Sequence, residues 1–364
     1  MQEAAVSLVR TLSKAEGAPA ALSDAEYVQL LGADGDELAA LCRLADEVRR
    51  SAVGAELTYV VNRNLDTGQV AGQHALVGDL VREAWSLGAT EVCMQGPVPA
   101  DAPAQEYLDL VRTITAAAPV HLHAYRAAEV ADAAHRLDTT PREFLQEAAA
   151  AGLATVPGTA ARILDDDVRA RLAGGPDLPV QRWIELIGTA HEVGLRSTST
   201  IVYGHVETPE QQVAHLRTLA EMQDRTGGFT ELIAMPMTPE AMPAHLTGIA
   251  RPGPSARETR ALHAVARLLL HGRIDHIQAA WPKLGTELSR AVLAGGADDF
   301  GGLLLDGTRW PAAGAESGLQ LSRAEIDSCA EQLGRRPRQR ATDYGTPPVT
   351  GRLGTARDGA NAAL

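Results

Sequence analysis

The sequence is poor in cysteine, in aromatic residues and in positive charge, and each shortage excludes a class of protein. Its 364 residues include three cysteines, Cys42, Cys93 and Cys329, which lie too far apart to form a disulfide framework or a CxxC pair. Aromatic residues make up 4%, so the core must consist mainly of Ala, Leu, Val and Ile. Lys and Arg total 33 against 46 Asp and Glu, and the net charge of −13 disfavours binding to nucleic acid or to anionic membranes.

Long hydrophobic runs and glycine-rich nucleotide loops are also missing. No stretch of about 18 residues stays apolar and uncharged, so we predict no transmembrane helix. Met1, Gln2 and Glu3 do not begin a signal peptide, and no Walker or Rossmann pattern occurs. We expect a cytoplasmic protein that binds a small molecule and neither nucleic acid nor membrane, with a homo-oligomer or a partner enzyme left open.

Short β-rich runs alternate with helix-length segments from about residue 58 onward. Eight such runs recur at a spacing of roughly 25–45 residues. They cover residues 58–62, 91–95, 120–125, 154–157, 197–203, 231–236, 274–280 and 301–305. This arithmetic predicts an α/β protein, a (β/α)₈ TIM barrel over residues 56–335. We expect a helical extension over residues 1–55 and a mobile tail over residues 336–364.

Local signals fix several helix ends. Thr208-Pro209 is an N-cap followed by proline at the first helical position, and Gly227-Gly228 is suited to end that helix. Ser322 and Glu325 have the spacing of a capping box. Ser23-Asp24 is a start signal in the extension.

The carboxyl ends of the strands are where a β/α barrel places its chemistry. Asn62, Arg63, Gln95, His123, Tyr125, Thr159, Tyr203, His205, Met235, Met237, Gln278 and Trp281 lie there. Two histidines with spacing two, His121 and His123, could share a metal with His205 or His276. No carboxylate accompanies them in a recognised pattern, so we predict no metal site. A nucleophilic Cys93 is disfavoured because it lies in mid-strand.

Nine stretches carry a family resemblance. They are TYVVNRN (58–64), GATEVCMQG (88–96), HLHAY (121–125), VPGTAARILDDDVR (156–169), TAHEVGLRSTSTIVYGHVETP (189–209), QDRTGGFTE (223–231), ARPGP (250–254), LLLHGRIDHIQAAWPKLG (268–285) and AGGADDFGG (294–302). In this order they resemble the tyrosine-using half of deazaflavin (FO) synthase, a radical S-adenosylmethionine (SAM) enzyme, and the related aminofutalosine synthases. The resemblance covers about residues 25–345.

The resemblance implies a full barrel that binds a [4Fe–4S] cluster and SAM, the cluster through C-x-x-x-C-x-x-C. Here that segment reads LDTGQVAGQHALVGDL (65–80), without cysteine. Because such a cluster requires thiolate ligands, we expect a degenerate member with no iron–sulfur cluster, no other cofactor and doubtful SAM binding. Other departures lie at Gly96-Pro97, where the family has Gly-Gly, and at Arg162, where it has Glu. Residues 237–243 lack the family's His and Asn.

The sequence keeps the family's strands and helices but changes residues at the carboxyl ends of the strands. Three functional hypotheses follow. The first is a biosynthetic enzyme of secondary metabolism, a lyase or transferase, that performs non-radical chemistry on an amino-acid- or nucleoside-like metabolite. The alternative is a non-catalytic binding or regulatory protein, which could partner a radical SAM enzyme. A further alternative is a retained role in deazaflavin coenzyme biosynthesis.

Under the first hypothesis each candidate residue receives a role. His123 and His205 are candidate catalytic residues because imidazole titrates near neutral pH, and Tyr203 is the third candidate. Substrate contacts are assigned to Asn62, Arg63, Gln95, Tyr125, Thr159, Arg162, Gln278 and Trp281. For each histidine, a purely structural role in a hydrogen-bonded barrel wall stays open.

Overall fold

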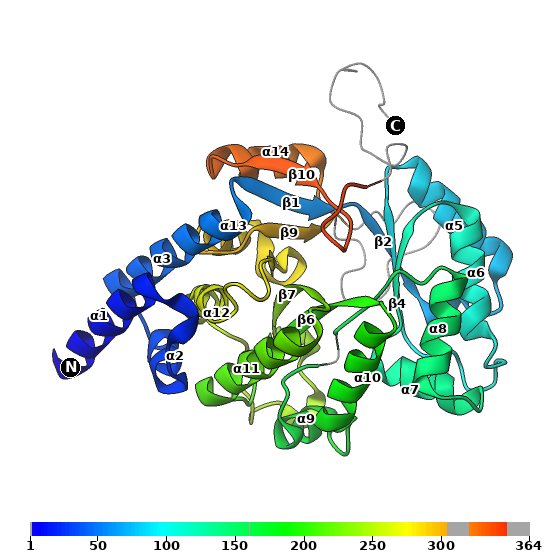
Figure 1. Ribbon diagram of the computed structural model, residues 1–364, viewed down its shortest axis with the longest axis horizontal. Coiled ribbons are helices and arrows are strands. Elements are labelled where there is room, and N and C mark those ends of the chain that lie inside the picture. Colours follow the sequence, from blue (N-terminus) through cyan, green and yellow to red (C-terminus); the bar gives the residue numbers. More distant parts are fainter. Residues whose placement is uncertain (1, 160, 304–319, 348–364) are drawn as a thin grey trace.

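The computed structural model describes residues 2–159, 161–303 and 320–347, in which helices surround one curved parallel sheet (Figure 1). The strands are β1 (Glu56–Val60), β2 (Asn62–Asp66), β3 (Glu91–Gln95), β4 (His121–Ala124), β5 (Thr155–Val156), β6 (Arg196–Tyr203), β7 (Phe229–Pro236), β8 (Ile277–Ala279), β9 (Asp299–Gly302) and β10 (Arg336–Gln339). Their order in the sheet is β10-β1-β9-β8-β7-β6-β5-β4-β3-β2.

Helices fill most of the segments between the strands. They are α1 (Gln2–Gly17), α2 (Asp24–Leu31), α3 (Gly35–Val53), α4 (Thr67–Val70), α5 (His74–Ser86), α6 (Glu106–Ala117), α7 (Ala127–Arg136), α8 (Pro141–Ala151), α9 (Asp166–Ala173), α10 (Val180–Glu192), α11 (Pro209–Thr226), α12 (Ala256–Leu269), α13 (Trp281–Leu293) and α14 (Arg323–Gln332). Short 3₁₀ turns lie at Pro19–Ala21, Pro239–Ala241 and Ala244–Leu246. None of the described helices is long and apolar enough to cross a bilayer.

The prediction of a closed eight-stranded barrel is wrong, although the α/β class holds. The sheet in the described residues has ten strands and is open, with β10 and β2 at its edges. The first predicted strand divides at Val61 into β1 and β2. Strand β1 has β9 on one side and β10 on the other, so β3 pairs with β2 instead. A C-terminal strand thus occupies the edge that a closed eight-stranded ring would have used.

The predicted tail also needs correction at its start. Residues 336–339 form β10, which pairs in parallel with β1, and Arg340 directly after it is 1% exposed. Charged side chains in RRPRQR concealed this strand, because edge strands commonly carry Arg and Lys. Residues 348–364 lie outside the described residues.

The capping predictions are confirmed by the geometry. Ser23 and Ser322 each form a capping box with a glutamate three residues later, at the starts of α2 and α14. Thr208 caps α11, and Gly227 ends that helix in a left-handed conformation. In the extension, α3 packs along α12, and the Arg257 guanidinium donates to the carbonyl oxygens of Leu31 and Ala33 at 2.8 and 2.9 Å.

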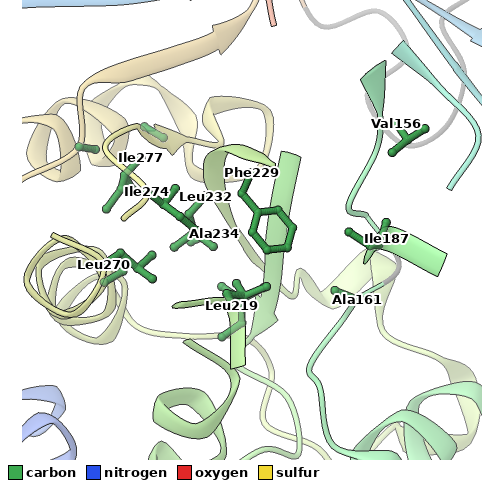
Figure 2. Packing of buried hydrophobic residues seen from close by; sticks show 14 of the residues in the cluster. Val156, Ala161, Ile187, Leu219, Phe229, Leu232, Ala234, Leu270, Ile274 and Ile277 are labelled. Carbon is green, nitrogen blue, oxygen red and sulfur yellow. The ribbon is translucent and has the colours of Figure 1, made fainter. Parts of the chain in front are cut away.

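The apolar core lies between the outer face of the sheet and the helices. Figure 2 shows Leu232 and Ala234 of β7 beside Leu270 and Ile274, both of which come after the end of α12. All four side chains are at most 1% exposed. Because successive strand residues point to opposite faces, Glu231, Ile233 and Met235 of the same strand point to the inner face. This alternation separates the core from the candidate site.

Candidate functional site

A cavity opens on the inner face of the sheet, lined by residues from most strands. Four side-chain carboxamides line it: Asn62, Asn64, Gln95 and Gln278. Charged or titratable groups at the wall are Glu91, Cys93, His123, Glu231, Lys283 and Arg340. Gly302 leaves space for the first carboxamide, since a Cβ there would lie 2.2 Å from Asn62 Oδ1. Polar side chains therefore form a large part of the wall.

Arg340 organises the charges beneath the cavity. Its Nε donates to Asp299 Oδ2 at 2.7 Å, and its Nη2 donates to Asp299 Oδ1 at 2.8 Å and to Glu231 Oε2 at 3.0 Å. Tyr344 also donates to Glu231 Oε2, at 2.9 Å, and its ring stacks on His276. Both carboxyl groups are at most 2% exposed. The segment after β10 thus supplies the cation that balances Asp299 and donates a hydrogen bond to Glu231.

Glu231 is the group whose titration the cavity changes most clearly. Burial, reinforced by the nearby Asp299 charge, raises the pKa of Glu231 to about 8 even though Arg340 opposes the shift. At neutral pH this carboxyl group is therefore protonated. Its Oε1 accepts no hydrogen bond from the described residues, so a proton donor or acceptor is available to a ligand.

We expect the free energy of unfolding to decrease as the pH rises, because Glu231 then loses its proton. A carboxyl group whose folded pKa of about 8 exceeds its reference value of 4.5 resists ionisation only when folded. The unfolded chain then binds fewer protons between these values, so the free energy of unfolding decreases over that range. Glu231→Gln removes this proton. Urea unfolding at pH 5, 6, 7 and 8 should show wild type losing stability relative to E231Q, whereas parallel pH profiles would contradict the assignment.

Two histidines and a threonine form the wall beside Glu91. His121 Nε2 and His123 Nδ1 each lie 2.7 Å from Thr155 Oγ1. Burial lowers the pKa of His123 to about 4, so its ring is neutral at pH 7. Glu91 accepts from the Cys93 thiol at 3.2 Å and from Thr342, while burial raises the pKa of Cys93 well above its usual value. A protonated Cys93 in this wall is a weak nucleophile.

Five predicted site residues meet at the cavity: Asn62, Gln95, His123, Thr159 and Gln278. Gln95 and Gln278 form no hydrogen bond through their carboxamides within the described part of the chain. The Thr159 hydroxyl, likewise without a partner among the described residues, is shielded from solvent. These groups supply donors and acceptors that a polar ligand can use.

Three other predicted residues face away from the cavity. Arg63 alternates with Asn62 on β2 and donates to Glu83 of α5 at 2.8 Å. Tyr125 donates to the Tyr107 carbonyl oxygen and packs against that ring. Tyr203 donates to Thr259 of α12 at 3.2 Å. Each of these side chains packs between the sheet and the helices, so the prediction that it contacts the substrate is corrected.

The remaining three also lie outside the lining. His205 Nε2 lies 3.0 Å from the Val202 carbonyl oxygen and Nδ1 accepts from Val206 N–H, so its ring closes the loop after β6. Arg162 forms an ion pair with Asp177, with 3.4 Å between its Nη1 and Asp177 Oδ2. Trp281 donates through Nε1 to the Gly302 carbonyl oxygen at 2.8 Å and supports the rim rather than lining it.

Sequence reasoning missed several lining residues. Glu91, Cys93 and Gln95 share one face of β3, and Glu231 and Ile233 share one face of β7. Period-two alternation extended backward from each strand end would have found Glu91 and Glu231. Arg340 had no such signal, because it was assigned to the tail.

The segment expected to hold an iron–sulfur cluster forms a short capped turn instead. Asp66 accepts from Gln69 N–H at 3.1 Å and caps α4. Gly72 N–H donates to Glu106 of α6 at 3.0 Å, and His74 lies 3.2 Å from the same carboxylate. Residues 65–80 thus tie the strand end to α6, with no thiol among them.

The cysteines elsewhere do not fit the cluster either. Cys42 is buried in α3, Cys329 is buried in α14, and Cys93 alone lines the cavity. Across the described ranges, no cluster of three His, Cys, Asp or Glu side chains is arranged to hold a metal ion. The described residues therefore do not fit three-thiolate ligation, and we derive no reaction step through a cluster or SAM.

Comparison with known proteins places these features in a family. Residues 227–352 match the family model "CofH/MqnC C-terminal region". FO synthase of Mycobacterium tuberculosis (strain CDC 1551 / Oshkosh) is 46% identical over 358 residues, which are 93% of this chain but 42% of that protein. A 5-amino-6-(D-ribitylamino)uracil–L-tyrosine 4-hydroxyphenyl transferase of Methanothermobacter thermautotrophicus is 36% identical over 92% of this chain and 96% of its own length.

Solved structures share the fold at low sequence identity. Methylornithine synthase (PylB) superposes with a TM-score of 0.66 at 15% identity, over 90% of this chain and 97% of the other. The hydrogenase maturase HydG of Carboxydothermus hydrogenoformans gives 0.68 at 12% identity, over 93% and 80%. At such identities the likeness shows the fold alone.

These relatives overturn several expectations drawn from the missing cysteines. A repurposed non-radical enzyme of secondary metabolism is contradicted, because relatives up to 46% identical are FO synthases. The expected absence of an iron–sulfur cluster, SAM or any other cofactor is contradicted by the same relatives, whose family uses both. The names synthase and transferase also support an enzyme. The chain spans about 42% of the length of the FO synthase and nearly the whole transferase, and it belongs to the family of the tyrosine-using half of FO synthase.

Proposed function

We propose that this chain acts in deazaflavin coenzyme biosynthesis, at the transfer of the 4-hydroxyphenyl group of L-tyrosine to 5-amino-6-(D-ribitylamino)uracil. The observation that carries the proposal is the 36% identity that extends over 96% of the transferase named for these molecules. A full-length match supports a shared substrate more strongly than the FO synthases, of which this chain spans 42%.

The cavity chemistry agrees with such a ligand. A ribitylaminouracil presents neutral amide edges and hydroxyl groups, which carboxamide side chains recognise because each offers both a donor and an acceptor. Gln95 on β3 and Gln278 on β8 make no hydrogen bond with other described residues and face the cavity from well-separated strands. His123 Nε2 adds a neutral donor or acceptor between them. We assign these three residues to binding and orienting the substrate.

The proposal is tested by binding and by product formation. Isothermal titration calorimetry on the full chain should detect binding of 5-amino-6-(D-ribitylamino)uracil. Gln278→Ala should weaken its affinity about tenfold, the effect of losing one buried hydrogen bond of about 1.4 kcal/mol. Anaerobic incubation with both molecules, SAM, iron, sulfide and a reductant, followed by mass spectrometry, measures whether a deazaflavin precursor forms on a chain whose described residues do not fit a three-thiolate cluster.

Gln181 provides the matched control, since it is an exposed glutamine on α10 that does not line the cavity. Gln181→Ala should bind like wild type. Failure of the uracil and of tyrosine to bind wild type would overturn the proposal. Binding without product would refute turnover by this chain and favour the non-catalytic binding alternative.

A further inference from the structure

A single helical turn holds Lys283 at the cavity wall. Lys283 N–H and Leu284 N–H donate to the Ala280 carbonyl oxygen at 3.0 and 3.1 Å. The Trp281 indole, 6% exposed, anchors the turn through its hydrogen bond to Gly302. Gly285 then adopts φ 71° and ψ 166°, which interrupts the helix. The backbone before Lys283 is therefore fixed while its half-buried side chain reaches the cavity.

Among the described residues that line the cavity, Lys283 is the cation without a carboxylate partner. The other cation of the lining, Arg340, is engaged by Asp299 and Glu231. His123 is neutral at pH 7. No carboxylate in the described ranges pairs with the Lys283 ammonium group. Arg340 already compensates Asp299, whereas the buried Glu91 carboxylate pairs with no Arg or Lys among the described residues, so an anion in the cavity needs a further cation.

We propose that Lys283 binds the carboxylate of the amino-acid substrate at the cavity wall and thereby selects amino acids over the corresponding amines. This inference rests on the proposed function for the identity of the amino acid, whereas the anion-binding role rests on the cavity charges alone. The hydrogen bonds of an ammonium group to a carboxylate are charge-assisted, so their loss weakens binding more than loss of a neutral contact.

Nuclear magnetic resonance of isotopically dimethylated lysines tests the contact directly. The lysines of the chain are Lys14 and Lys283, so two side-chain signals are expected, assigned with K14R and K283R. Lys14 pairs with Glu26 at 2.7 Å in the N-terminal extension and is the internal control. L-Tyrosine and 3-(4-hydroxyphenyl)propanoate should shift the Lys283 signal, whereas tyramine, which has no carboxylate, should not.

Affinities of Lys283→Met and Lys283→Arg give an independent readout. Tyrosine should bind K283M about 10- to 100-fold more weakly than wild type, tyramine should bind both alike, and K283R should recover most of the affinity. An unmoved Lys283 signal, equal shifts with tyramine, or equal losses for both ligands would overturn the inference. If the carboxylates shift Lys283 but the ribitylaminouracil does not bind and no precursor forms, the proposed function fails and the anion site stands.

Discussion

Replacing Arg340 with methionine should lower the free energy of unfolding by about 3–5 kcal/mol, the effect expected when one partner of a buried ion pair is removed. Arg340 is 1% exposed, and its guanidinium group is the cation that contacts Asp299 and Glu231. Methionine fills similar volume but leaves Asp299 charged and uncompensated, since Thr58 and a backbone amide provide only neutral donors. Urea unfolding followed by circular dichroism measures the loss.

Arg338 on β10, two residues before Arg340, is the matched control. It pairs with Glu56, and both side chains are about a third exposed, at 34% and 37%. Arg338→Met should therefore cost less than about 1 kcal/mol. In the R340M background, Asp299→Asn should recover part of the lost stability because it removes the stranded charge. Similar losses of stability for R340M and R338M would contradict a buried ion pair between Arg340 and Asp299.

Gly158→Ala should destabilise the fold by more than about 3 kcal/mol, beyond the usual range for overpacking. An alanine Cβ at this position would lie 1.9 Å from the Thr198 carbonyl oxygen and 2.8 Å from its carbonyl carbon. Both obstacles are backbone atoms of β6, so no rotamer change relieves the contact. Because Thr159 and Thr198 line the cavity, the forced shift should also weaken substrate binding. Thermal unfolding and calorimetry measure the two effects.

Gly188 offers the opposite case for comparison. It lies within α10, and apart from its own helix backbone a Cβ there would meet no atom within 4 Å. Gly188→Ala should stabilise the protein by about 0.5–1 kcal/mol, since alanine favours the helix and restricts the unfolded chain. A G158A variant as stable as wild type would contradict the close approach of the segment after β5 to β6.

Local signals predicted the elements well because each depends on neighbouring residues. The Thr208 cap and the strand at Glu91–Gln95 were correct for this reason. The open sheet was not predictable in this way, since β10 pairs with a strand about 280 residues earlier, Glu56 opposite Arg336. Short-range patterns carry no information on which strand takes a given edge.

The same distinction between local and long-range information separates the site residues that the sequence predicted from those that it did not. Asn62 and Gln278 were found because a strand end fixes their position, while naming both Asn62 and Arg63 ignored that neighbours on a strand face opposite sides. Tyr203 ends β6 on the face opposite Thr198, which alternation would have indicated, whereas His205 follows the strand, where the chain turns and alternation no longer applies. Arg340 escaped notice because its partners Glu231 and Asp299 are 109 and 41 residues away.

The place of Arg340 in the chain has a consequence for how the protein matures. Glu91, Glu231 and Asp299 are synthesised before Arg340, whose guanidinium group pairs with Asp299 and donates to Glu231. Until then, the nascent polypeptide must keep those carboxyl groups hydrated or protonated, because burying them alone is costly. The cavity can therefore bury its acids only after β10 and Arg340 have been synthesised and have docked, and a transcript cut short before codon 340 would leave Asp299 without its cation.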